Sequence, residues 1–217
     1  MNIKITRKKI KNLILRVTAD GEVSVSAPYR VPVPYIEEFV HSKKEWIEKK
    51  MKMLREKKDN KELKFEDGEK FLYLGNTYRI KIFNSDKDFC VFQNNFLLLN
   101  SSSNEIQHKK EIVTKFIWNS LFEVLYDLNK QIGNKIGHLP VKIRLRDMKT
   151  RWGSCNSYKK TITYNFRLYT KPIEAIEYVV LHELAHIPYP HHQKDFWNFI
   201  EKYMPDFKKR KQILKEI

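Results

Sequence analysis

The sequence predicts an α+β protein in which a mainly β N-terminal region precedes a core of helices and strands. Through the N-terminal region, short stretches of alternating apolar residues are separated by turn signals, a pattern typical of hairpins. From Ile112 onward the apolar residues instead recur every three or four positions, which is the period of a helix. The composition changes near residues 100–110. We therefore expect a β-rich region over residues 1–105, with one amphipathic helix, and a second region over residues 106–217.

Three hairpins are predicted in the N-terminal region. Asp20-Gly21, Gly75-Asn76 and Gln93-Asn94-Asn95 separate the alternating stretches, and such residues suit the tight turns of hairpins. The strands are expected at residues 13–17 and 23–27, 71–74 and 77–82, and 89–92 and 96–99. Between the first two hairpins, the apolar residues of segment 35–55 follow a helical rhythm, which predicts an amphipathic helix with a charged outer face.

The C-terminal region is predicted to begin with a long helix that ends near Gly133. Its apolar positions are Ile112, Val113, Phe116, Ile117, Leu121, Val124, Leu125 and Leu128. Alternating residues then predict strands at 141–145 and 161–166. Another helix opens near Pro172 and runs into His182-Glu183-Leu184-Ala185-His186.

The composition is that of a basic globular protein. The chain of 217 residues has 42 Lys and Arg against 26 Asp and Glu, a formal net charge of +16. Such an excess attracts phosphate-bearing or acidic partners, so nucleic acid is a candidate partner, and a solvated Lys-rich surface is the alternative explanation. No apolar run suits a membrane span or a signal peptide, and the two cysteines suggest no disulfide framework. We expect a cytoplasmic protein that does not enter the membrane.

The segment from His182 to His186 has the spacing of a zinc site. Residues four apart share one helix face, so both imidazoles can reach an ion at about 2.0–2.1 Å. Glu183 projects about 100° away around the helix, where it can touch a metal-bound water instead. Zinc lowers the pKa of such a water to near 7, and Glu183 would take its proton as general base. The pattern predicts a zinc-dependent hydrolase, and the alternative is two helical histidines with ordinary packing contacts.

A third ligand is expected soon after the helix ends. Pro188 and Pro190 cannot continue the helix, so the chain must turn there. The turn can bring His191 or His192 back to the metal and leave a fourth position for water. The spacing does not choose between the two histidines, and Glu201 is a rival ligand from the final segment.

Several segments carry a family resemblance. They are residues 149–155 (Lys-Thr-Arg-Trp-Gly-Ser-Cys), 165–168, 178–186 and 192–197, with Ser-Ala-Pro-Tyr-Arg-Val-Pro at 26–32 and Tyr-Leu-Gly at 73–75. On these segments the sequence resembles the YgjP-like (SprT-like) family of zinc metallopeptidase domains over nearly its whole length. The resemblance implies a zincin-like helix-sheet core with the HExxH motif on a helix. It also implies that His192, four residues before Phe-Trp, is the third zinc ligand.

The same resemblance suggests how substrate binds. In such a core a strand near the active site can pair with an extended peptide, and residues 161–166 would be that strand. Related SprT-type proteases suggest a further alternative, a nucleic-acid-associated protease that acts on DNA-bound protein. The sequence has no recognisable zinc ribbon. It also lacks the glycine that metzincins place after the second motif histidine, so the metzincin subclass is not implied.

Arg151 and Tyr189 are additional candidate catalytic residues. Arg151 could stabilise an oxyanion or a phosphate near the metal, or could simply tie strands together, and Tyr189 could donate to a developing negative charge. The activated water can also attack phosphorus, so a nucleotide triphosphate pyrophosphohydrolase is the alternative to a metallopeptidase. Arg or Lys deep beside the metal would favour the nucleotide, whereas an open groove with a free strand edge would favour peptides.

Overall fold

The protein, as a computed structural model, is described over residues 3–18, 21–59 and 63–214. It has the mixed α+β composition that the sequence predicts, with sheets and helices in both halves. The chain divides into two compact units, Met1–Leu63 and Lys64–Ile217. Among the described residues the first unit has one sheet and the second has two, and each unit has its own hydrophobic core.

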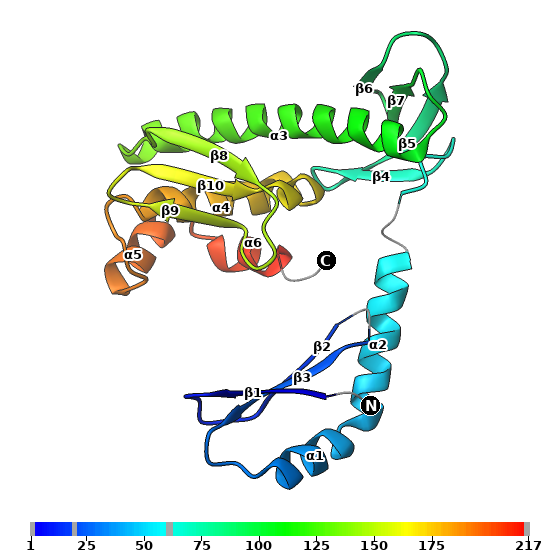
Figure 1. Cartoon of the computed structure of the whole chain (residues 1–217). Helices are drawn as coiled ribbons and strands as arrows, with labels where there is room; N and C mark the ends of the chain where they lie inside the picture. The colour runs from blue at the N-terminus through cyan, green and yellow to red at the C-terminus, as the bar shows by residue number, and fades with distance from the viewer. Residues whose placement is uncertain (1–2, 19–20, 60–62, 215–217) are drawn as a thin grey trace. The chain divides into compact units, whose positions relative to one another are not determined.

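The first unit is a three-stranded sheet packed against two helices (Figure 1). Its elements are β1 (Ile3–Lys8), β2 (Ile14–Val17), β3 (Val23–Pro28), α1 (Val33–Ser42) and α2 (Lys44–Asp59), with the strands in the order β1-β3-β2. Every second strand residue faces the helices, and the buried core is formed by Val23, Val25, Ala27, Ile36, Val40 and Ile47. The pairing of β2 with β3 confirms the first predicted hairpin.

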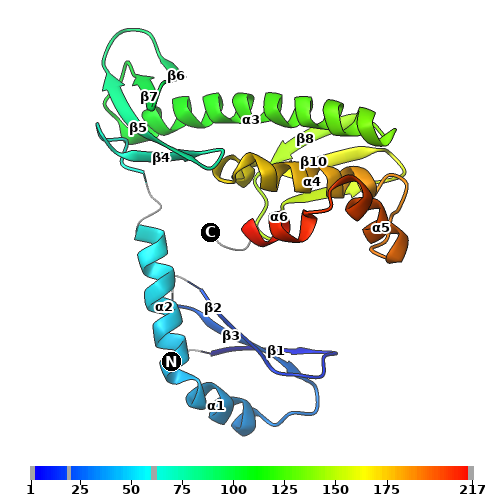
Figure 2. The same ribbon diagram turned by 180° about the vertical axis from the view of Figure 1, so that it is seen from behind.

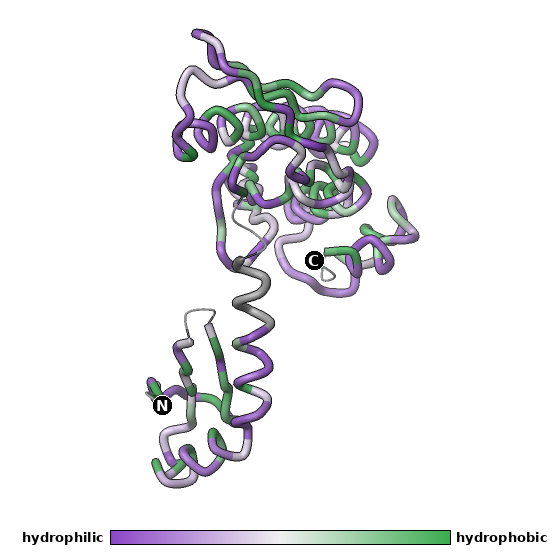
Figure 3. The backbone as a smooth tube through the Cα atoms, turned by 90° about the vertical axis from the view of Figure 1, so that its right-hand side faces the viewer, coloured by the Kyte–Doolittle hydropathy of each residue, from purple (hydrophilic) through white to green (hydrophobic). Residues whose placement is uncertain are grey.

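The predicted helix over 35–55 is two helices. Lys43 ends α1 with φ −104° and ψ 11°, outside helical geometry, and α2 begins at the next residue. The break lets α1 bury Ile36 and Val40 while α2 buries Ile47 against the same sheet. In Figure 3 the described part of α2 is mostly hydrophilic, in agreement with the charged outer face expected for this segment.

The second unit contains a four-stranded sheet in the order β4-β5-β7-β6. Its strands are β4 (Lys70–Tyr73), β5 (Asn76–Phe83), β6 (Phe89–Gln93) and β7 (Phe96–Asn100). The antiparallel pairs β4/β5 and β6/β7 are the second and third predicted hairpins. Parallel pairing of β5 with β7 joins the two hairpins into one sheet, a long-range contact that turn signals do not reveal.

This sheet belongs with the C-terminal elements, so the units separate before it and not near residue 105 as expected. The long helix α3 (Ile106–Ile136) contacts β6, and the 3₁₀ helix η1 (Phe166–Thr170) contacts β4. The backbone N–H of Leu74 donates to the carbonyl of Tyr169 at 2.7 Å, and the hydroxyls of Tyr73 and Ser120 lie 2.6 Å apart. The change in composition near residue 105 marks a change of secondary structure within one packed unit.

The remaining elements form a three-stranded sheet with helices against it. They are β8 (Lys142–Arg146), β9 (Gly153–Asn156), β10 (Thr161–Asn165), α4 (Ile173–Ala185), α5 (Lys194–Tyr203) and α6 (Phe207–Ile213). Helix α4 is the central element, because it contacts α3, α5, α6 and β9 (Figure 2). Its residues from Tyr178 to Ala185 are buried except for His182. None of the helices in the described ranges is long and apolar enough to cross a membrane.

The expectation that residues 161–166 offer an open edge to a peptide is wrong. β10 is the middle strand of the order β8-β10-β9, so its backbone is paired on both sides. Within the described part of the chain, β9 pairs only with β10, and it is β9 that contacts α4. The strand edge beside α4 is therefore offered by residues 153–156, in the Arg-Trp-Gly-Ser-Cys segment.

Candidate metal centre

Three imidazole rings converge at the end of α4. His182 lies within α4, His186 is its C-cap and His192 lies in the turn before α5. One ligand atom from each side chain lies within 4.8 Å of the others, so the three could hold a metal ion. The Nε2 atoms of His182 and His192 are 3.0 Å apart. Two nitrogens bound to one tetrahedral zinc lie about 3.3 Å apart, so His182 and His192 are already near that spacing.

The end of the helix is built to return the chain to these rings. Backbone N–H groups of Ile187 and Tyr189 bond to the carbonyls of Leu184 and Ala185, both at 3.0 Å, and this closes the last turn. The prolines at 188 and 190 then prevent further helix, and α5 starts again at Lys194. Buried Phe196 on α5 lies under the cluster, with its ring centroid 4.7 to 5.0 Å from all three imidazoles.

Hydrogen bonds prepare two of the rings as ligands. The Nδ1 atom of His186 is 3.1 Å from the carbonyl oxygen of Tyr189. Because a carbonyl only accepts, Nδ1 carries the proton and Nε2 keeps its lone pair for a metal. The Tyr178 hydroxyl lies 3.5 Å from Nδ1 of His182. Burial lowers the pKa of His182 to about 3 and also lowers the pKa of His186, so both rings are neutral at pH 7, as metal binding requires.

Glu183 lies beside the three rings in a tightly limited space. Its side chain is buried, and a Cβ added at Gly153 of β9 would stand 2.6 Å from its Oε1 atom. Burial raises the pKa of Glu183 to about 8, and the charge of Arg151 opposes the rise. Among the described residues none donates a hydrogen bond to this carboxyl, although every fully enclosed polar side-chain atom of those residues has a partner, so the carboxyl oxygens are not fully enclosed. The carboxyl group is therefore open to the pocket and can bind water.

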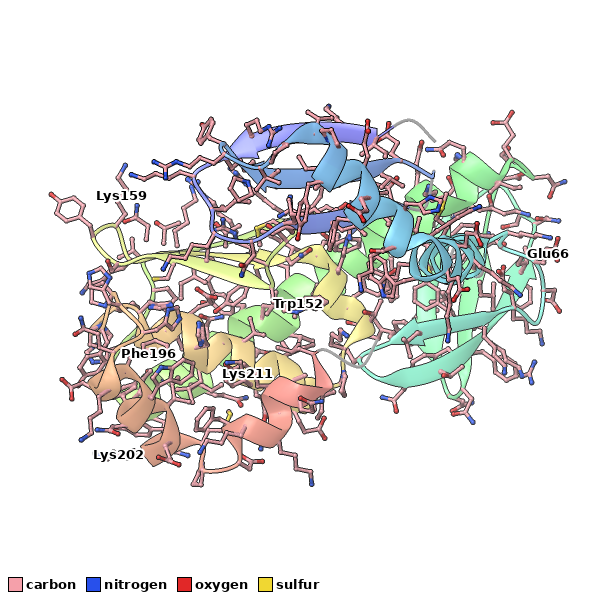
Figure 4. All side chains as sticks on the ribbon, turned by 90° about the horizontal axis from the view of Figure 1, so that it is seen from below. Glu66, Trp152, Lys159, Phe196, Lys202 and Lys211 are labelled. Carbon is pink, nitrogen blue, oxygen red and sulfur yellow. The ribbon has the colours of Figure 1, made fainter. Side chains whose placement is uncertain are left out.

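A pocket of about 510 Å³ lies in front of the rings. Its lining comes from the start of β9, from α4, from α5 and from the C-terminal segment, and the residues are Arg151, Trp152, Gly153, Tyr178, Val179, His182, Glu183, His192, Trp197, Lys211 and Leu214. Trp152 and Lys211 are labelled in Figure 4. The ammonium of Lys211 lies 4.9 Å from the centre of the Trp197 ring, which is stacked on His192 at 5.6 Å. The pocket thus combines apolar walls with two cations.

The C-terminal wall of the pocket is held by buried and half-buried contacts. Arg210 on α6 donates to Asp206 at 2.8 Å and forms an ion pair with Glu177 on α4. The buried ammonium of Lys171 donates to the carbonyl of Leu214 at 3.4 Å. These contacts fix α6 against α4, and so they place Lys211 and Leu214 at the pocket.

The structure gathers most of the residues that the sequence singles out. His182, Glu183, His192 and Arg151 line the pocket, and His186 completes the histidine cluster. His191 is exposed and stands outside the cluster, although it adjoins His192. Glu201 lies exposed on α5 with its carboxylate 4.0 Å from the ammonium of Lys208, so this residue is not placed to be the rival ligand.

Tyr189 takes a different position from the one expected for a catalytic hydroxyl. Its ring packs on Phe199 with centroids 5.3 Å apart, and the residue is not part of the pocket lining. What it offers to the site is its backbone carbonyl, the acceptor for His186. A hydroxyl near the cluster is instead supplied by Tyr178, which burial keeps neutral by raising its pKa to about 12.

Seven lining residues were not among the candidate site residues: Trp152, Gly153, Tyr178, Val179, Trp197, Lys211 and Leu214. Tyr178 carries a signal that could have been used, since it lies four residues before His182 and hence on the same helix face. Lys211 carries none. It is one of many lysines in the chain, and only the packing of α6 on α4 brings it to the pocket.

A family model matches most of this chain. The model of the family "YgjP-like, metallopeptidase domain" matches residues 11–217. Among solved structures, the chain is similar to the metallopeptidase zymogen of Pyrococcus abyssi abylysin, with 24% identity and a TM-score of 0.39. That match covers 42% of this chain and 90% of the other. The comparison with curated proteins gives no match.

Proposed function

Because the chain belongs to the family of YgjP-like metallopeptidase domains, as its sequence motifs predict, we propose that it hydrolyses peptide bonds with a zinc ion held by His182, His186 and His192. The observation that carries the proposal is the convergence of three imidazoles beside buried Glu183, whose carboxyl group accepts no hydrogen bond from any described residue. Family membership supports a metal-dependent hydrolase, and the geometry supports these four residues in their roles.

Zinc is the proposed ion because of the donor set. Three imidazoles without a carboxylate or thiolate form a set that zinc accepts in catalytic sites, with the fourth position left for water or substrate. When bound, the ion supplies a Lewis acid and lowers the pKa of a coordinated water to near 7. The hydrogen bond from His186 to the Tyr189 carbonyl supports this assignment, because it fixes the ring orientation that such a site needs.

Glu183 is proposed as the general base. Its carboxylate accepts a proton from the attacking water, whose oxygen forms a bond to the scissile carbonyl carbon. The protonated Glu183 then gives that proton to the leaving amine as the carbon–nitrogen bond breaks. Burial against Gly153 suits this role, because the desolvation that raises the pKa of Glu183 in the metal-free protein makes its carboxylate a stronger base than an exposed one.

The strand edge of β9 is proposed to hold the peptide. β9 begins at Gly153, which touches Glu183, and its outer edge has no partner among the described strands. An extended substrate can add to this edge through main-chain hydrogen bonds, which do not depend on the substrate sequence. The pocket walls of Trp152, Val179 and Leu214 would then receive an apolar side chain next to the scissile bond.

A second candidate function is hydrolysis of a nucleoside triphosphate. Arg151 and Lys211 both line the pocket, and their charges act on Glu183 and His182 respectively. Two cations beside the proposed metal suit the charge of a phosphate chain. Both side chains are exposed, so they lie at the open side of the pocket and could equally bind an acidic group of a peptide.

One experiment separates the two functions. The zinc-loaded protein and its E183Q variant are incubated in parallel with an unfolded protein substrate and with the common nucleoside triphosphates. New peptide termini are followed by mass spectrometry, and released phosphate and pyrophosphate are measured directly. Peptide cleavage that E183Q abolishes supports the peptidase. Cleavage of the triphosphates alone would support a nucleoside triphosphate hydrolase in place of the peptidase. Equal activity of the parent and E183Q would contradict the role of Glu183 as general base.

A further inference from the structure

The charges of the first unit are separated between its sheet and one of its helices. Residues 1–17, which include β1 and β2, carry six Lys and Arg residues and no acid. β3 has no charged residue at all, whereas α1 has two glutamates, Glu37 and Glu38, and no Lys or Arg. The helices cover one face of the sheet, so the cationic residues belong to its other face or to its edges.

Strand register places these cations around a row of small polar side chains. Lys4 of β1 pairs with Ser24 of β3, and Ser24 pairs on its other side with Arg16 of β2. Paired residues point to the same face of a sheet, so Lys4, Ser24 and Arg16 form one row across it. In the next row, Thr6 and Ile14 flank Ser26, and beyond it Lys8 pairs with Pro28. We call this set of eight residues the outer face of the first unit.

The cationic side chains of the outer face are exposed and unpaired within the described protein. Lys4, Lys8 and Arg16 are exposed, and no described group forms a hydrogen bond or ion pair with their side chains. Arg7 of β1 shows the contrast, because it is half-buried on the alternate position and donates to the carbonyls of Pro28 and Val31. Arg7 holds the turn after β3, whereas the charged groups of the other three contact no described partner.

We propose that the outer face binds the phosphodiester backbone of a nucleic acid. Cα atoms two strands apart lie about 10 Å from each other and those four residues apart along a strand about 13 Å. Lys4, Arg16 and Lys8 therefore surround a shallow area floored by serine, wide enough for a sugar-phosphate chain. The long cations would contact phosphates on both sides, and the Ser24 hydroxyl can donate to a phosphate oxygen. The net charge of +16 adds long-range attraction.

Nucleic acid fits this face better than a membrane does. A peripheral membrane site needs several large apolar side chains that enter the lipid beside its cations. Of the eight residues of the outer face, Ile14 is the one large apolar side chain, and it is 41% exposed. The face has no aromatic residue. Its contacts would be electrostatic and independent of base sequence. We therefore expect it to bind single and double strands with little sequence preference and with a strong dependence on salt.

The test compares two triple variants of equal charge. In K4Q/K8Q/R16Q the three cations of the outer face are neutralised, and in K43Q/K44Q/K49Q three exposed lysines at and near the start of α2 are neutralised instead. Binding of a labelled 20-base single strand and of the corresponding duplex is measured by fluorescence anisotropy over a range of salt. EDTA is present throughout, so hydrolysis and the proposed metal play no part. Circular dichroism checks that both variants are folded.

We expect K4Q/K8Q/R16Q to raise the Kd at least about tenfold in 100 mM salt, and to reduce the slope of log K against log salt by about two to three, near 0.9 for each lost phosphate contact. The α2 variant should change the Kd less than about threefold. Equal effects of the two variants, or no effect of the first, would overturn the proposal. Binding to anionic vesicles without binding to nucleic acid would overturn it as well. Should the triple variant not fold, R16Q alone is expected to reduce the slope by about 0.9, and an unchanged slope would count against the proposal.

Discussion

The Cα of Gly153 on β9 lies so close to Glu183 on α4 that an added Cβ would stand 2.6 Å from the carboxyl Oε1 atom. Any side chain at position 153 must therefore displace the proposed general base. This contact links the Arg-Trp-Gly-Ser-Cys segment to the histidine motif of α4, although some thirty residues separate the two in sequence. The contact also explains why position 153 is a glycine, since there is no room for a side chain there although the φ angle of Gly153 is not positive.

The G153A variant tests this contact. We expect the extra methyl group to push the Glu183 carboxyl away from its position, with a loss in kcat of at least about tenfold and zinc content unchanged, since none of the three histidines moves. S154A, at the next position of β9, is the control and should keep its activity within about twofold. Rates are measured on the cleaved substrate and zinc by elemental analysis. A fully active G153A would show that Glu183 can act from another position.

The pH dependence of stability reports on Glu183 in the metal-free protein. Its pKa is raised from 4.5 to about 8 by burial, so the folded protein keeps a proton that the unfolded chain loses. The contribution of Glu183 to the free energy of unfolding therefore falls as pH rises from about 4.5 to 8. The fall is at most about 1.4 kcal/mol for each unit by which the pKa is raised. The glutamine of E183Q cannot lose a proton, so this variant should lack the fall. The free energy of unfolding of E183Q minus that of the parent should therefore increase by a few kcal/mol between pH 5 and pH 8.

The measurement is urea unfolding with EDTA, followed by tryptophan fluorescence. Three of the four tryptophans, Trp118, Trp152 and Trp197, belong to the second unit, so both proteins carry W46F to remove the signal of the first unit. All other titrating groups are common to the two proteins and cancel in the difference. If the two stability curves run parallel from pH 5 to pH 8, the raised pKa of Glu183 is wrong.

Tyr178 and Tyr189 should behave differently when their hydroxyls are removed. The Tyr178 hydroxyl lies 3.5 Å from His182 and lines the pocket, whereas the Tyr189 ring packs on Phe199 outside it. We expect Y178F to weaken zinc affinity about tenfold, as loss of a partner behind a metal ligand does. Y189F should leave affinity and kcat within about twofold. Zinc affinity is measured by competition with a chelator of known affinity. A larger loss of affinity in Y189F than in Y178F would contradict the placement of Tyr178 behind His182.

Lys211 is expected to discriminate between substrates by charge. It lies in the pocket over Trp197, and its neutralisation in K211Q should lower kcat/KM for a substrate with an acidic group by about five- to twentyfold. For a neutral peptide the change should be small. K209Q, which neutralises an exposed lysine of α6 outside the pocket lining, is the control. Equal losses on both substrates would assign Lys211 a structural role only.

Much of the fold follows from local signals. The three hairpins, the long helix α3 and the helix that carries His182 are set by turn residues and by apolar period, and these elements agree with the structure. What local signals do not contain is the order of strands within a sheet. Residues 161–165 form a strand as expected, but it is paired on both sides. The strand edge beside α4 belongs to β9, which is too short and polar to stand out in the sequence.

Some residues of the candidate site also follow from local sequence signals, whereas others reach the site only through tertiary packing. His182, Glu183 and His186 are fixed by helical geometry, and the two prolines account for the turn that brings His192 back. The sequence resemblance, and not spacing, distinguishes His192 from His191. Lys211 and Gly153 reach the site only through the packing of α6 and β9 on α4, which no periodicity encodes. Tyr189 was a reasonable candidate from its place in the turn, but the direction of its side chain depends on Phe199 of α5.

Metal content is the most direct test of the central claim that His182, His186 and His192 hold one zinc ion. Elemental analysis is made on the purified protein and on the variants H182A, H192A and H191A. We predict close to one zinc per chain in the parent protein and in H191A, and its loss in H182A and H192A. A parent protein that takes up no zinc, or zinc retained in H182A, would contradict the account.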